Sequence, residues 1–164
     1  MLLLRKLLPV GALTTLLACG PSDDEVAAQS YATTMAPVLA ENLTLARAHL
    51  VAAAAAQKSN DGAAIAERVH AEYAPAAKSL HARAVAATPT DPALADTHGQ
   101  LVRAWNDRAT AYAELDAAWA SRDVNAFDAA VKKNLRAHLE EEAYFNAVNA
   151  QLAPYGLHLE QYPQ

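Results

Sequence analysis

The sequence predicts an all-α protein, and three observations support this. The 164 residues are 53% hydrophobic but only 6% aromatic, and alanine, the strongest helix former, supplies much of the hydrophobic share. Only 5 Gly occur, and runs of β-branched residues are few, which argues against a sandwich, a barrel or a doubly wound sheet. Apolar residues recur at helical spacing in four segments separated by turn residues. We therefore expect an up-down-up-down antiparallel four-helix bundle.

Composition and motifs exclude several classes of function. The formal net charge of -5 argues against a generic nucleic-acid-binding surface, so we expect no nucleic-acid partner. The single Cys excludes an internal disulfide framework and a Cys-x-x-Cys redox pair. No Gly-rich phosphate loop, His-Glu-x-x-His zinc helix or Gly-x-Ser-x-Gly elbow is present. We therefore expect no enzyme and no cofactor.

The N-terminus has the pattern of a secretion signal. Arg5 and Lys6 precede an apolar run over 7–18 that is shorter than the roughly 20 residues of a membrane-spanning helix. The run ends in Leu16-Leu17-Ala18-Cys19, which resembles the lipobox of bacterial lipoproteins. The resemblance covers only the N-terminus, and it implies that the signal peptide 1–18 is removed and that Cys19 is acylated.

The resemblance also implies a location. Two or three acyl chains, palmitate among them, give stable attachment where one chain binds only marginally, so the chain would contact a membrane through its lipid anchor. Residues 19–24 would then be the lipidated Cys and a short tether in the cell envelope. Gly20 stands where an aspartate often retains lipoproteins in the inner membrane. We therefore expect the outer membrane, facing the periplasm, if the source is Gram-negative.

The first two helices follow from caps and turns. Ser22 and Glu25 form a capping box, and the apolar pattern then continues to about Lys58. The residues Ser-Asn-Asp-Gly at 59–62 predict a turn, and the second helix is expected over 63–87. Pro37 and Pro75 lie inside these two patterns and should kink them.

The third and fourth helices are delimited in the same way. Asp91 caps the third helix, Pro92 fits its first position, and the pattern continues to about Ser121. Asp123 caps the fourth helix, which ends before Pro154. The bundle therefore covers 25–153, followed by a C-terminal tail at 154–164. The stripe expected to face the core on the fourth helix consists of Phe127, Val131, Leu135, Phe145 and Leu152.

Polar residues on inward faces are the candidate site. Helical wheels and the 1.5 Å rise per residue place four of them within about 8 Å of one axial level, and a fifth on the inner face of the first helix. These residues are Asn42, Arg108, His138 and Glu142 at the common level, and His49. A buried Glu142 needs a partner, and Arg108 and His138 are the nearest candidates.

Two interpretations of this set stay open. A structural polar layer that fixes helix register is favoured. The alternative is a metal or small-ligand pocket in which His138 and Glu142, four residues apart on one helix face, supply ligands. A di-iron site at Glu67 and His70 is disfavoured because Glu67 projects away from the apolar stripe.

The sequence thus predicts a lipid-anchored helical-bundle protein of the bacterial envelope. We expect a non-enzymatic binding or structural role, with a protein partner in the envelope as one possibility. The alternative is a protein that binds a metal or a small ligand through its inward-facing His and Glu side chains.

Overall fold

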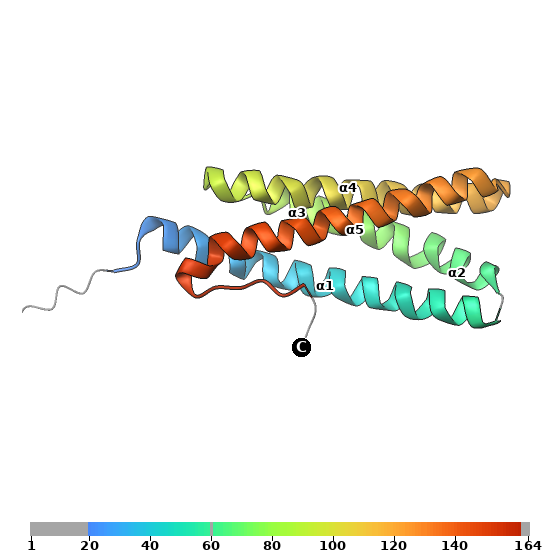
Figure 1. Ribbon diagram of the computed structural model, residues 1–164, viewed down its shortest axis with the longest axis horizontal. Coiled ribbons are helices and arrows are strands. Elements are labelled where there is room, and N and C mark those ends of the chain that lie inside the picture. Colours follow the sequence, from blue (N-terminus) through green and yellow to red (C-terminus); the bar gives the residue numbers. More distant parts are fainter. Residues whose placement is uncertain (1–19, 60, 162–164) are drawn as a thin grey trace, which may run out of the picture.

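A computed structural model describes residues 20–59 and 61–161, and Figure 1 shows their arrangement. The signal peptide 1–18 and Cys19 lie outside these described residues. All regular structure in the described ranges is helical, as the composition predicted. The elements are α1 (Asp23–Ser59), α2 (Gly62–Arg68), the π-helix η1 (Val69–Tyr73), α3 (Ala74–Ala86), α4 (Pro92–Ser121), α5 (Val124–Leu152) and the 3-10 turn η2 (Ala153–Tyr155).

Side-chain caps fix where the helices begin. The Ser22 hydroxyl accepts a hydrogen bond from the backbone N–H of Glu25 at 3.2 Å. Asp91 and Asp123 accept equivalent bonds at the starts of α4 and α5, from the third residue after each Asp. Each cap pairs a backbone N–H that has no partner within the helix. The helix starts predicted from sequence are therefore confirmed to within a residue or two.

The segments α2, η1 and α3 form one continuous helical rod. The π-helix η1 lies directly before α3, whose second residue is Pro75, and the backbone N–H of Ala74 bonds to the carbonyl of Val69, five residues earlier. Pro75 has no N–H and its ring crowds the preceding turn, so the regular α-helical ladder is interrupted at this point. The sequence predicted kinks at Pro75 and Pro37. The structure has a π-helical turn next to Pro75, whereas α1 continues through Pro37 as a single α-helix.

Four helical rods, α1, α2–α3, α4 and α5, pack against one another along the long axis of the molecule (Figure 1). The start of α5 lies beside α4, and its end approaches α1 (Figure 1). The larger apolar cluster contains most of the bulky core residues, including Met35, Leu80, Leu101, Trp105 and Tyr144. A smaller cluster, with Tyr73 and Tyr112 as its largest members, lies nearer the turn between α1 and α2.

The core face of α5 differs from the predicted stripe. Phe127, Val131 and Leu135 are exposed, whereas Ala130 and Ala137 are fully buried. Small side chains allow α5 to approach α4 closely, so alanines occupy the contact line and the larger residues lie at its edges. The expected stripe was therefore wrong in the first half of α5 and correct at Phe145 and Leu152.

The C-terminal tail folds back along the bundle. After the left-handed turn at Gly156, Leu159 is buried in the larger cluster. The Asn149 side chain bonds both backbone groups of Leu159, accepting from its N–H at 2.8 Å and donating to its carbonyl at 2.9 Å. These two bonds hold the described part of the tail against α5.

Candidate functional site

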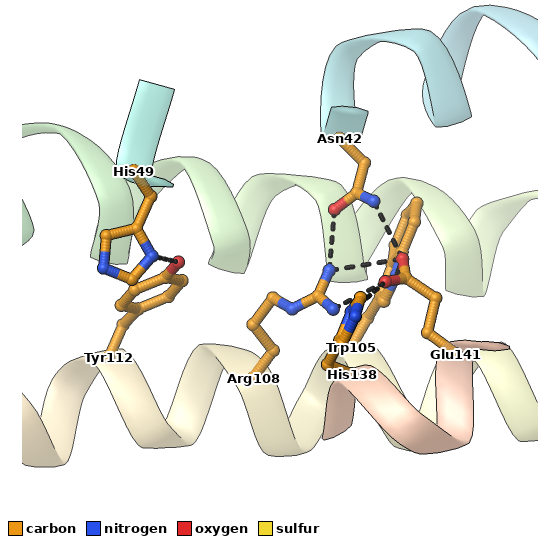
Figure 2. A network of polar contacts seen from close by, with 7 residues as sticks. All are labelled: Asn42, His49, Trp105, Arg108, Tyr112, His138 and Glu141. Atoms are coloured by element: carbon orange, nitrogen blue, oxygen red, sulfur yellow. Dashed lines mark hydrogen bonds and ion pairs between the residues drawn. The ribbon is translucent and has the colours of Figure 1, made fainter. Parts of the chain in front are cut away.

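A buried ion pair lies at the centre of the bundle. Arg108 of α4 donates to Glu141 of α5, from Nη2 to Oε2 at 2.6 Å and from Nη1 to Oε1 at 3.2 Å (Figure 2). Both side chains are more than nine-tenths buried. The guanidinium fork matches the two carboxylate oxygens, which is the strongest geometry that such a pair adopts.

Two neutral side chains complete this cluster. Asn42 of α1 donates to Glu141 Oε1 at 2.8 Å and accepts from Arg108 Nη1 at 2.9 Å (Figure 2). Trp105 donates its indole N–H to the same Oε1 at 2.7 Å. His138 lies at the solvent edge, with Nδ1 at 3.8 Å from Glu141 Oε2. The cluster therefore ties α1, α4 and α5 together at one level.

The surroundings of Glu141 keep it ionised. Burial alone would raise its pKa, but His138, Arg108 and Trp105 favour the carboxylate and lower the pKa to about 2. The Glu141 carboxylate in turn raises the pKa of His138, whose partial burial opposes the shift. A carboxylate that is saturated by donors and stays charged at neutral pH is poorly suited to exchange protons in catalysis. The arrangement suits a fixed ion pair that sets helix register.

Glu142, the carboxylate expected in this cluster, is exposed. Its neighbour Glu141 takes the buried position because the inner face of α5 is set by Ala137, Glu141 and Tyr144. One residue corresponds to about 100° around a helix. Because the predicted stripe of α5 was rotated away from the true buried face, the prediction selected Glu142 instead of Glu141. The sequence prediction of Asn42, Arg108 and His138 near one level agrees with their positions in the structure.

His49 lies apart from the ion pair. Its Nδ1 is 2.7 Å from the Tyr112 hydroxyl (Figure 2). Its ring lies against that of Tyr73, with the centroids 5.2 Å apart. Burial lowers the pKa of His49, and the positive charge of Arg108 lowers it further. His49 is therefore a neutral imidazole at physiological pH and belongs to a separate contact between α1 and α4.

A third polar layer was not predicted as a unit. The Tyr31 hydroxyl lies 2.8 Å from His98 Nδ1 and 2.8 Å from the Tyr144 hydroxyl, and His98 Nε2 lies 2.8 Å from the Ala84 carbonyl oxygen. The carbonyl can only accept, so Nε2 carries a proton and Nδ1 accepts from Tyr31. Tyr31 and Tyr144 are far from His98 in sequence, and no spacing rule joins the three residues.

A cavity of about 520 Å³ opens between the helices near the turn from α1 to α2. Small residues line much of it, and Leu115, Trp119 and Phe127 form larger parts of its wall. His49, Gln57 and Asn134 contribute polar groups to the wall. Asp116 also lines it and pairs with His70 at 2.8 Å. The His70 pairing raises the pKa of that imidazole. This volume lies within the range of small-molecule sites.

Within the described ranges, no group of three or more His, Cys, Asp or Glu side chains lies close enough together to hold a metal ion. None of the helices described here combines the length and the apolar character needed to cross a bilayer. Comparisons with protein-family models, curated proteins and solved structures gave no match.

Proposed function

We propose that the chain is a lipid-anchored protein of the bacterial envelope whose helical body binds a molecule without catalysing a reaction. The Leu-Leu-Ala-Cys motif at 16–19 supports the anchor. Helix α1 begins at Asp23, so acylated Cys19 would hold the start of α1 near the membrane. The exposed acids Asp23, Asp24 and Glu25 would be repelled by an anionic surface and keep the body off the lipid.

We also propose that the four rods run up, down, up and down. The segments between them occupy only 60–61, 87–91 and 122–123. Such short connections cannot return along helices of roughly 40 Å, so successive rods are expected to run in opposite directions. In this topology the C-terminal ends of α1 and α4 lie at the same end of the bundle, away from the lipid anchor.

The binding role is supported most directly by the contrast between the two kinds of internal surface. The charged and aromatic hydroxyl groups of the polar layers are bonded to one another. The cavity near the C-terminal ends of α1 and α4 instead leaves Trp119 and Phe127 about two-fifths exposed at its mouth. Exposed large apolar side chains around a hollow are typical of a binding site. We favour binding of a small molecule or of an envelope protein there over a metal site.

Replacement of Cys19 by Ser tests the anchor. The wild-type chain should fractionate with membranes and carry the added mass of acyl chains, whereas C19S should lose both properties. Release of acyl groups by mild hydrolysis, followed by mass measurement, provides an independent control. A wild-type protein without acyl mass would overturn the proposed location.

Fluorine NMR tests the binding role. The chain has 2 Trp, so 5-fluorotryptophan labelling gives one reporter at the cavity mouth, Trp119, and one in the core, Trp105. An extract of bacterial envelopes should shift the Trp119 signal and leave that of Trp105 unchanged, with Trp119→Phe used for assignment. An extract that shifts neither signal contradicts the binding role.

A further inference from the structure

The cavity exists because small residues meet where the rods diverge. Ala53 and Ala56 face it from α1, and Ala66 faces it from α2. At this end of the molecule, α5 lies beside α4 and away from α1 (Figure 1). A methyl group cannot fill the space that a Leu or Phe would occupy, so the seam stays hollow. The hollow is therefore a consequence of the small side chains of Ala53, Ala56 and Ala66.

The aromatic wall of the cavity is held in place. The Trp119 ring lies against Gly62, where an added Cβ would come within 2.9 Å of it. The Phe127 ring lies next to that of Trp119, with the centroids 6.5 Å apart. A molecule that covers these two partly exposed rings would remove apolar surface from water, which favours binding.

Among the polar residues that line the cavity, His49 offers a hydrogen-bonding atom, Nε2, in a ring whose position is fixed. Its Nδ1 is held by the Tyr112 hydroxyl, and Nε2 is on the side of the ring that faces away from the ion-pair cluster (Figure 2). Nothing within the described part of the chain bonds Nε2. The Tyr112 hydroxyl can donate or accept, so the neutral ring can present either an N–H or a lone pair at Nε2. A hydroxyl group can bond either form.

The charges around the cavity disfavour a charged occupant. Among the residues that the structure describes, no Lys or Arg lines the cavity. Arg108, which influences His49 from the next layer, is engaged by Glu141. An anionic ligand would therefore face the Asp116 carboxylate, with no Lys or Arg among the described lining residues to pair with it. A cation would compete with His70 for the same carboxylate. A neutral ligand avoids both the repulsion by Asp116 and the competition with His70.

We propose that the cavity binds a neutral, mainly apolar molecule that carries one hydroxyl group, which bonds Nε2 of His49 while its apolar part covers Trp119 and Phe127. This rests on the proposed binding function and specifies the chemical class of its ligand. His49 is then a residue that determines specificity, and the small side chains of α1 and α2 determine the size of the ligand.

Three compounds with one ring skeleton test this chemistry. The probes are 2-naphthol, naphthalene and 2-naphthoate, titrated calorimetrically into the full chain in lipid nanodiscs, with protein-free nanodiscs as the blank. We expect 2-naphthol to bind about fivefold more tightly than naphthalene, since the hydroxyl adds one hydrogen bond. We expect 2-naphthoate to bind more weakly than either neutral compound, because the site offers no cation.

Two neighbouring alanines give a matched pair of variants. Ala53 lines the cavity and Ala54 is exposed on the same helix. Ala53→Trp should fill the hollow and weaken 2-naphthol binding at least tenfold, whereas Ala54→Trp should change it by less than twofold. His49→Phe should abolish the preference for 2-naphthol over naphthalene. The Ala53→Trp result decides the location even if His49→Phe fails to fold.

Several results would overturn the inference. Equal affinity for naphthalene and 2-naphthol, tighter binding of 2-naphthoate, or equal effects of the two Trp variants would each do so. Absence of binding together with a dimer that Ala53→Trp dissociates would show that a second copy covers the cavity. In that case the small-molecule inference fails while the binding function stands, and the Trp119 fluorine signal tests that function separately.

Discussion

At the scale of single residues, the Arg108 and Glu141 pair makes one position on α5 critical and its neighbour dispensable. Glu141→Gln leaves the Arg108 charge buried without a counter-charge, so we expect a loss of about 3–5 kcal/mol in the free energy of unfolding. Glu142 is exposed, and Glu142→Gln should change stability by about 0.5 kcal/mol or less. Urea unfolding followed by circular dichroism measures both. Equal losses of stability in the two variants would contradict the assignment of Glu141 as the buried carboxylate.

The same carboxylate predicts how stability depends on pH. Its pKa is about 2 in the folded protein, against an ordinary value of 4.5. Between these values the unfolded chain takes up a proton that the folded chain does not, so lowering the pH favours unfolding. The stabilisation by Glu141 is fully present above about pH 5 and is lost as the pH falls toward 2. Glu141→Gln should flatten the acid limb of the stability profile, and an unchanged limb would contradict this assignment.

At the scale of the helices, the end of α4 carries a residue in an unfavourable conformation. Arg122 caps α4 with φ of 57°, in the left-handed region where a side chain costs roughly 1–2 kcal/mol and glycine is preferred. Arg122→Gly should therefore raise the free energy of unfolding by about 1 kcal/mol. The matched change Ala120→Gly, at an exposed position within the same helix, should lower it by about 1 kcal/mol. Changes of the same sign in thermal unfolding would contradict this account of the cap.

At the scale of the whole molecule, packing is uneven along the bundle. Bulky side chains fill the half that contains Trp105, whereas alanines leave a cavity in the other half. Ala53→Leu, which adds apolar atoms to the cavity, should stabilise the unliganded protein by about 1 kcal/mol. Ala137→Leu, at a fully buried contact between helices, should destabilise it by about 1–3 kcal/mol. Stabilisation by both variants, or by neither, would show that packing does not differ between the two positions.

Local signals in the sequence determined the helices and their limits. Ser22, Asp91 and Asp123 bond backbone groups three residues away, so short-range spacing was enough to find them. Helical period and rise also brought Asn42, Arg108 and His138 to one level, because both quantities are fixed by backbone geometry. The lipobox motif at 16–19 remains a prediction from sequence alone.

The tertiary structure decided which face of α5 is buried, and with it the identity of the carboxylate. Bulky apolar residues are a poor guide to the buried face of α5, because the close approach of two helices favours small side chains along the line of contact. Hence Ala130, Ala137 and Glu141 face inward, while Val131, Leu135 and Glu142 do not. The cavity was likewise set by tertiary packing, because a hollow depends on the distances between four helices and each helix specifies only its own wall.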